Sequence, residues 1–171
     1  MLRIIAATAI VLTAAAPGSA QDVRGEITAT LDGEERQWFV TGTNLVSQST
    51  WSGNVSYAKV ELYGHASDET ITDAGEALQI NFGVLTQDDG SASSELPEMT
   101  YLADGMGESY VANSDTGADV RVESIEIDGS QLSISGTFEA SLAFTGDLGQ
   151  TIDQSRTKPI RGRFDAEIKG M

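Results

Sequence analysis

The 171 residues include ten Lys and Arg, 26 Asp and Glu and no cysteine, which gives a formal net charge of -16. Nucleic acids and anionic membrane surfaces bind positively charged proteins, so this charge argues against both as partners. The lack of cysteine excludes a disulfide framework and a lipid-anchored N-terminal cysteine.

The first twenty residues have the pattern of a secretory signal peptide. Arg3 precedes an apolar run over residues 4–16, which is shorter than the ~20 residues of a membrane span. Small residues at positions 18 and 20 fit the specificity of signal peptidase. We therefore expect residues 1–20 to be removed and residues 21–171 to form a single β-domain in a bacterial periplasm or outside the cell.

Residues 21–171 carry 9 basic and 26 acidic residues, a formal charge of -17, but the two kinds are unevenly placed. Residues 156–171 hold five basic and two acidic residues, whereas residues 21–155 hold four basic and 24 acidic residues. The basic segment is predicted to be a strand that lies beside acidic neighbours, and the alternative is a dedicated anion site.

Alternation of apolar and polar residues predicts the first hairpin at the start of this domain. Residues 25–31 alternate and end at Asp32-Gly33, a pair typical of tight hairpin turns. Trp38 and Val40 continue the pattern after the turn. Residues 41–54 are polar and are predicted to form a long connection that contains one short strand.

The rest of the chain repeats the same alternation, interrupted by predicted loops at 67–76, 86–98 and 146–158. These segments contain acidic runs, glycine or proline, none of which supports regular pairing. Pro159 is expected to open the last strand, where a missing N–H is tolerated. The remaining strands are predicted at residues 55–64, 77–85, 99–103, 110–112, 120–127, 131–145 and 159–168.

The strand at 120–127 contains a change of phase. Val120 and Val122 have one parity and Ile125 and Ile127 the other, so a regular strand would expose one of the two pairs. A β-bulge near Glu123-Ser124 would turn both pairs toward the same face.

The segment 131–145 is the most regular strand and shares a spacing with both ends of the domain. Glycine followed by large, small and large apolar residues on one face suits a sheet that bends sharply over its own core. We expect the three strands to lie side by side. The spacing occurs as Gly136-x-Phe138-x-Ala140-x-Leu142, Gly162-x-Phe164-x-Ala166-x-Ile168 and Gly25-x-Ile27-x-Ala29-x-Leu31. The predicted core includes Phe138, Leu142, Phe82, Ile80 and Phe164.

These strands, with no helical period, predict an all-β fold. It is a single antiparallel β-sandwich or flattened small β-barrel of about 8–9 strands.

The two ends of the domain also carry a resemblance. The opening Gly25-x-Ile27-x-Ala29-x-x-Asp32-Gly33 with Trp38, and the closing Gly136-Thr137-Phe138 with Gly162-x-Phe164, resemble uncharacterised exported bacterial β-domains classed as domains of unknown function. Many members of that group are lipid-anchored, and this chain lacks the cysteine that carries the anchor. The resemblance implies an exported β-domain and transfers no catalytic residue.

No pattern in the sequence identifies a catalytic site. His65 is the only histidine and lies near Ser67 and Asp68, but proximity in sequence at a strand end does not create a triad, so we expect a solvent-facing histidine. The sequence contains no nucleophile elbow, phosphate-binding loop or dinucleotide fingerprint.

A metal site is considered at one loop. Asn113-x-Asp115-x-Gly117-x-Asp119 places oxygen ligands at alternate positions, as calcium loops do. Its glycine occupies a ligand position and no glutamate stands at position twelve, so we expect no cofactor and leave calcium near Asp115 and Asp119 as the alternative. One histidine and no cysteine argue against zinc.

The predicted function is that of an exported non-catalytic β-domain that binds a small ligand, a glycan or a protein partner. A hydrolase of the cell envelope that uses acidic residues is the alternative. The predicted ligand-binding residues are aromatic: Tyr57 and Tyr63 alternate with the apolar row of their strand, and Trp51 is expected at its rim. We expect no membrane span, and the oligomeric state stays open.

The leader gives the first testable prediction. Intact-mass spectrometry of the protein recovered from the periplasm or medium should find a chain that begins at Gln21, because signal peptidase cleaves after the small residue Ala20. Recovery of exported protein that retains Met1 would contradict the prediction.

Overall fold

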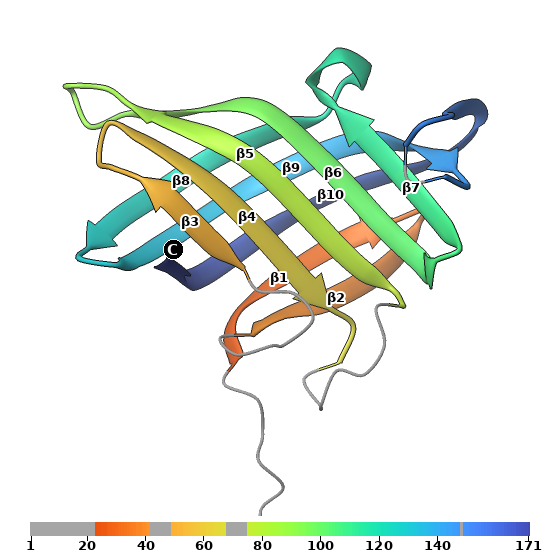
Figure 1. Ribbon diagram of the computed structural model, residues 1–171, viewed down its shortest axis with the longest axis horizontal. Helices are drawn as coiled ribbons and strands as arrows, with labels where there is room; N and C mark the ends of the chain where they lie inside the picture. The colour runs from red at the N-terminus through yellow and green to blue at the C-terminus, as the bar shows by residue number, and fades with distance from the viewer. Residues whose placement is uncertain (1–22, 42–48, 68–74, 148) are drawn as a thin grey trace, which may run out of the picture.

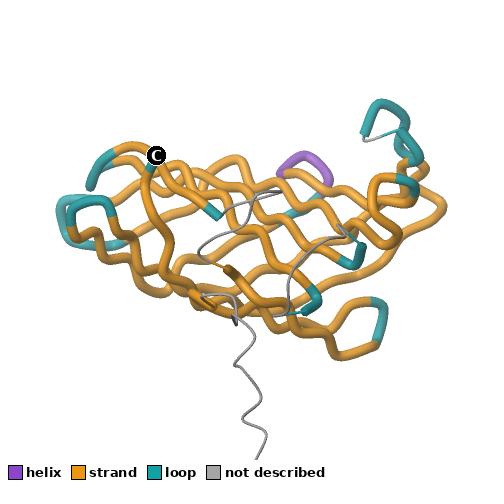
Figure 2. Tube along the Cα trace, turned by 60° about the horizontal axis from the view of Figure 1, so that its bottom comes forward, coloured by secondary structure: helices purple, strands orange, loops and turns teal. Residues whose placement is uncertain are grey.

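The computed structural model describes residues 23–41, 49–67, 75–147 and 149–171, and within these ranges the chain is almost entirely β-strand (Figure 1). The all-β prediction is confirmed. Figure 2 shows the single helical turn, a 3-10 helix, among the strands. No helix in the described ranges is long and apolar enough to cross a membrane. The elements are β1 (Val23–Leu31), β2 (Glu34–Thr41), β3 (Thr50–Gly53), β4 (Tyr57–His65), β5 (Ala77–Thr86), β6 (Ala92–Met106), β7 (Glu108–Asn113), η1 (Ser114–Thr116), β8 (Asp119–Asp128), β9 (Gln131–Thr145) and β10 (Asp153–Gly170).

The strands form one sheet that closes on itself into a flattened barrel. Pairing runs around the ring in the order β1, β2, β4, β5, β6, β7, β9, β10 and back to β1. β8 extends the sheet beside β9, and β3 lies between β4 and β10. In the described part of the chain every pairing is antiparallel except the short contact of β3 with β10. In Figure 1 the front layer is β4, β5 and β6, and the back layer is β8, β9, β10 and β1.

The core fills the space between these two layers. All five predicted core residues are buried, each with at most 2% of its surface exposed. Phe82 of the front layer contacts Phe164 of the back layer at 5.7 Å between ring centroids, so aromatic packing joins the layers. The interior is therefore packed with side chains.

The three strands that share the glycine spacing are neighbours, in the order β1, β10, β9, as predicted. Gly136 lies opposite Phe164, and Gly162 lies between Ala29 and Phe138. A methyl group added at Gly136 would lie 2.7 Å from Cζ of Phe164 and would overlap the carbonyl oxygen of Arg121. The glycines therefore provide the space that the aromatic rings and adjacent backbones occupy.

Two local predictions about backbone geometry are also confirmed. Asp32-Gly33 is a two-residue hairpin turn, since Leu31 pairs with Glu34 and both turn residues have positive φ. The register of β8 on β9 shifts between Val122 and Ser124, which is the predicted bulge. The short strand expected within 41–54 is β3, while 42–48, 68–74 and the leader lie outside the described residues.

The loop predicted at 86–98 is wrong for its second half, because β6 begins at Ala92 and includes Pro97. Asn81 pairs with Glu98 and Gly83 with Glu95, so Leu96 and Pro97 together face one residue of β5. This bulge, with Leu96 at φ 48°, removes Pro97 from the regular ladder. Proline was therefore a misleading signal here.

The loop predicted at 146–158 is also too long, because β10 begins at Asp153 and Pro159 lies inside it. The carbonyl of Pro159 accepts a hydrogen bond from the backbone N–H of Asp32 at 2.8 Å. In an antiparallel strand the N–H and C=O of one residue point to the same side, so the missing donor faces the turn where β1 has ended. The strand loses no central ladder bond.

The glycine spacing leads to a stability prediction. Gly136→Ala should lower the free energy of unfolding by ~1 to 3 kcal/mol, because the added methyl meets backbone and a packed ring. Gly146→Ala is the matched control, since its methyl would lie 3.8 Å from the nearest atom of Phe144. Urea unfolding of both variants measures the difference. Equal stabilities would show that close approach at Gly136 is not required.

Candidate functional site

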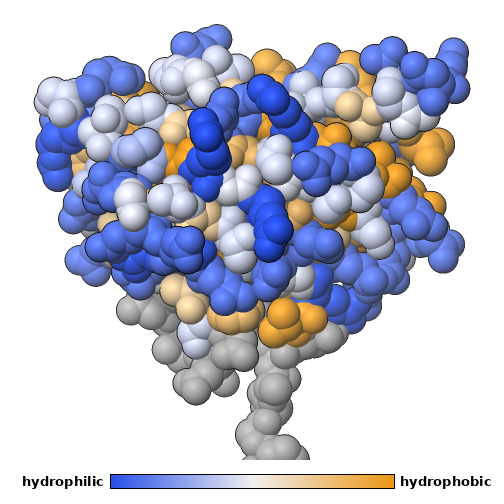
Figure 3. Space-filling model, turned by 180° about the vertical axis from the view of Figure 1, so that it is seen from behind, coloured by the Kyte–Doolittle hydropathy of each residue, from blue (hydrophilic) through white to orange (hydrophobic). Residues whose placement is uncertain are grey.

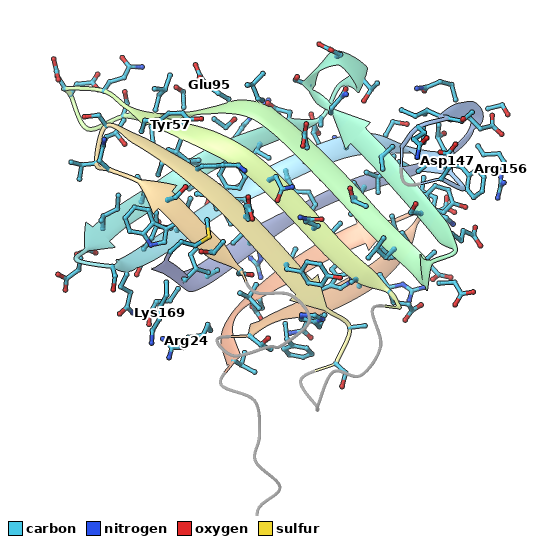
Figure 4. All side chains as sticks on the ribbon, in the orientation of Figure 1. Arg24, Tyr57, Glu95, Asp147, Arg156 and Lys169 are labelled. Atoms are coloured by element: carbon cyan, nitrogen blue, oxygen red, sulfur yellow. The ribbon has the colours of Figure 1, made fainter. Side chains whose placement is uncertain are left out.

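The predicted aromatic surface is not formed, because Trp51 and the two tyrosines lie on opposite faces of the sheet. Trp51 belongs to β3 and pairs with Val60, so it points into the core, with 6% of its surface exposed. Its Nε1 donates to the carbonyl of Ser130 at 3.1 Å. Tyr57 is 43% exposed on the outer face (Figure 4), and Tyr63 is half-buried. Sequence alternation placed the tyrosines correctly, but it did not show that Trp51 is in a paired strand.

His65 is at the end of β4 as predicted, but it is buried and not solvent-facing. Its ring lies 4.7 Å from the ring of Tyr63, and the pairing of β4 with β2 places His65 opposite Phe39. Burial lowers the pKa of His65 to about 4. Ser67 is exposed, and Asp68 lies outside the described residues.

The loop considered for calcium uses its oxygens in other ways. Oδ1 of Asn113 accepts from the backbone N–H of Thr116 at 3.1 Å and caps η1. Oδ2 of Asp119 accepts from Nε of Arg121 at 3.0 Å. Across the described ranges no group of three His, Cys, Asp or Glu side chains is placed to hold a metal ion.

A groove of about 910 Å³ crosses the outer face of the back layer. Its floor is formed by β1, β10 and β9, and its two sides by β2 and β8. Figure 3 shows this face, where strongly hydrophilic side chains gather at the centre. The floor includes Gly162 and the side chains of Thr28 and Thr137 on the two neighbouring strands. Sequence reasoning did not identify this surface.

The register of the five strands arranges the polar residues of the groove in two rows across the sheet. Alternation turns all of them outward, and neighbouring members come from adjacent strands. We call the first the arginine row and the second the mixed row. The arginine row is Gln37, Thr28, Arg163, Thr137 and Arg121, and the mixed row is Glu35, Thr30, Arg161, Glu139 and Asp119.

Three of the four arginines that line the groove are paired with carboxylates, and one of them, Arg36, contacts Glu34 and Glu76. Arg161 contacts Glu139 with 3.0 Å between Nη2 and Oε2, and Arg121 contacts Asp119 at 3.0 Å. Both arginine side chains are more than three-quarters exposed, so each pair contributes little to stability. Arg163 differs, because its Nε donates to the hydroxyl of Thr28 at 3.3 Å.

The prediction that the basic C-terminal strand lies beside acidic neighbours is confirmed along β10. Arg161 pairs with Glu139 of β9, and Lys158 contacts Asp32 at 3.3 Å. Arg156 approaches Glu108 at 3.7 Å and also lies over the ring of Phe144, 3.6 Å from its centroid (Figure 4). The sequence could have indicated the groove through this basic strand, but only the register shows which residues join it.

The groove offers binding chemistry and no evident catalytic constellation. It contains guanidinium and hydroxyl donors beside carboxylate acceptors, a combination that suits a polar ligand with hydroxyl and anionic groups. None of its three carboxylates, on Glu35, Asp119 and Glu139, is buried, and the last two accept hydrogen bonds from arginines.

No known protein family model matches the chain, and no characterised protein has a detectably similar sequence. The function is therefore inferred from the geometry of the chain itself.

The buried histidine gives a prediction about pH. The pKa of His65 is about 4 in the folded state and ordinarily about 6.5, so the unfolded chain binds the proton first as pH falls. The contribution of neutral His65 to stability is complete above pH 6.5 and is lost between pH 6.5 and 4, by up to about 3 kcal/mol. His65→Gln should lack this loss.

Urea unfolding of wild type and His65→Gln at several pH values measures this loss of stability between pH 6.5 and 4. Asp89, Asp147 and Asp153 have pKa values lowered mainly by hydrogen bonds from Ser91, Thr151 and Ser155, respectively, and both proteins share their effect at acidic pH. Parallel curves for the two proteins between pH 4 and 6.5 would contradict the prediction.

Proposed function

We propose that this chain is an exported, non-catalytic binding domain that holds its ligand in the groove of the back layer. One observation carries the proposal: the register of five strands aligns two rows of outward polar side chains across a concave surface. Side chains on paired strands keep fixed spacings, so the binding groups are largely preorganised. The leader and the resemblance of both chain ends to exported β-domains support export.

The groove replaces the aromatic surface as the proposed binding site. Trp51 is buried, and Tyr57 lies over Gly83, where a methyl group added to the glycine would be 2.9 Å from the tyrosine hydroxyl. Tyr57 therefore covers a bare stretch of β5. The groove instead presents polar side chains from five strands at one place.

The alternative function, a hydrolase that uses acidic residues, has less support. General acid catalysis by a carboxyl group commonly depends on burial or on a second carboxylate that raises its pKa. Glu139 and Asp119 of the groove are instead solvent-accessible and receive hydrogen bonds from Arg161 and Arg121. Both carboxylates are therefore engaged in ion pairs with arginines, which suits binding better than proton donation.

A thermal-shift screen with a blocked groove tests the proposal. Mature protein is screened against neutral and acidic oligosaccharides, amino acids and short peptides, because a compound that binds only the folded state raises the melting temperature. Thr137→Trp fills the centre of the groove floor, whereas Lys59→Trp alters the outer face of the front layer and leaves the groove open.

Every stabilising compound that binds in the groove should lose its effect in Thr137→Trp and keep it in Lys59→Trp. Stabilisation of equal size in wild type and Thr137→Trp would show that the groove is not the binding site. A screen in which no compound shifts the melting temperature would count against the proposal as a whole.

A further inference from the structure

The charge of the groove is concentrated in the arginine row. This row contains two arginines and no carboxylate, a formal charge of +2, in a domain whose formal charge is -17. The mixed row on one side has one arginine and three carboxylates, a formal charge of -2. On the other side, Glu26 and Asp165 are cross-strand partners, so that flank is also acidic. The arginine row is therefore a narrow positive track between two acidic borders.

Arg163 is the centre of this track. Its cross-strand neighbours are Thr28 and Thr137, both uncharged, and among the described residues no carboxylate lies within 4.0 Å of its guanidinium. Arginine presents five donors in a planar fork that matches a carboxylate. Arg163 lines the groove, and in the described structure only its Nε is engaged, with Thr28, so its other donors are available to an anionic group.

The track extends beyond a single anionic group. Arg163 on β10 and Arg121 on β8 are two strands apart, which places their backbones about 9.6 Å from each other. Thr137 lies between them and offers a hydroxyl. A ligand that contacts both arginines is therefore extended and carries more than one acidic group.

The surroundings of the track point to a ligand rich in hydroxyl groups. The carboxylates of Glu35, Glu139 and Asp119 border it as potential hydrogen-bond acceptors, and Thr28 and Thr30 add hydroxyls. The only aromatic residue of the lining, Phe138, is 2% exposed, so the groove has no aromatic or apolar anchor of the kind that centres protein interfaces. Acidic groups together with many hydroxyls are the chemistry of sugar acids.

We infer that the groove binds an acidic oligosaccharide, with a carboxylate of one uronic acid unit on Arg163 and a second acidic unit toward Arg121. This inference rests on the proposed function, because it names the ligand class of the same groove. Hydroxyls of the sugar rings donate to the carboxylates of the mixed row, and the acidic borders align the chain with the positive track.

Isothermal titration calorimetry with tetragalacturonic acid tests the inference, and its methyl ester is the matched ligand because esterification removes the charges and keeps the hydroxyls. The acid should bind at least tenfold more tightly than the ester. Arg163→Gln should weaken binding of the acid by about 10- to 100-fold, in line with hydrogen bonds to charged groups. Arg156→Gln, the same change on the same strand but outside the groove lining, should weaken it less than threefold. Circular dichroism and melting curves show whether both variants are folded.

The outcomes separate this inference from the proposed function. Equal affinity for acid and ester, or equal effects of Arg163→Gln and Arg156→Gln, would overturn the acidic-ligand inference. The inference would also be overturned if the acid fails to bind while another compound binds wild type and does not bind Thr137→Trp. In that case the groove would still be the binding site. Binding of the acid that survives Thr137→Trp would overturn both. Competition by inorganic phosphate at the concentration of the acid would show an unspecific anion contact and would also overturn the inference.

Discussion

The close approach of β1, β10 and β9 is the constraint on which the rest of the structure depends. Gly162 has no side chain, so the backbones of β10 and β1 come together there, and Gly136 leaves the space that the ring of Phe164 fills. Phe164 then reaches Phe82 across the core and joins the layers. A larger residue at either glycine would push apart strands that must remain paired for the ring to close. The same three strands also form the floor of the groove on the outer face, so the core and the groove share one scaffold.

Much of the fold follows from alternation alone, because each residue's neighbours two positions away fix its face. Alternation identified the core residues, the Asp32-Gly33 turn and even the β8 bulge, since two valines and two isoleucines of opposite parity could not otherwise share a face. The proline signal failed at Pro97 and Pro159, where tertiary context supplies a bulge or removes the need for a donor. A proline in the sequence shows that one backbone N–H is missing. Whether the sheet loses a hydrogen bond there depends on the neighbouring strand.

The candidate site was harder to predict, because it depends on which residues of different strands lie opposite one another in the sheet. The sequence shows that Thr28, Arg163, Thr137 and Arg121 face outward, but these residues are up to 135 positions apart and only the register makes them one row. The aromatic signal was misleading for the opposite reason: Trp51 and Tyr57 are close in sequence, and pairing with β4 sends Trp51 into the core. The locally basic C-terminal strand was the one available signal, and ion pairs with acidic neighbours account for Arg156, Lys158 and Arg161 but not for Arg163.

The proposed binding of an acidic ligand by an acidic domain needs a physical account, and the ranges of the forces supply one. The formal charge of -17 repels an anion at long range, but at 0.15 M ionic strength charges more than about 8 Å apart are largely screened. At contact the guanidinium of Arg163 forms direct, charge-assisted hydrogen bonds, which salt weakens much less than the distant repulsion. Distant charges therefore add little repulsion, and selectivity is left to the few groups that touch the ligand. An anion out of register with the arginine row would meet Glu139 or Glu26 and be rejected, so the acidic borders contribute specificity by repulsion as the row contributes affinity.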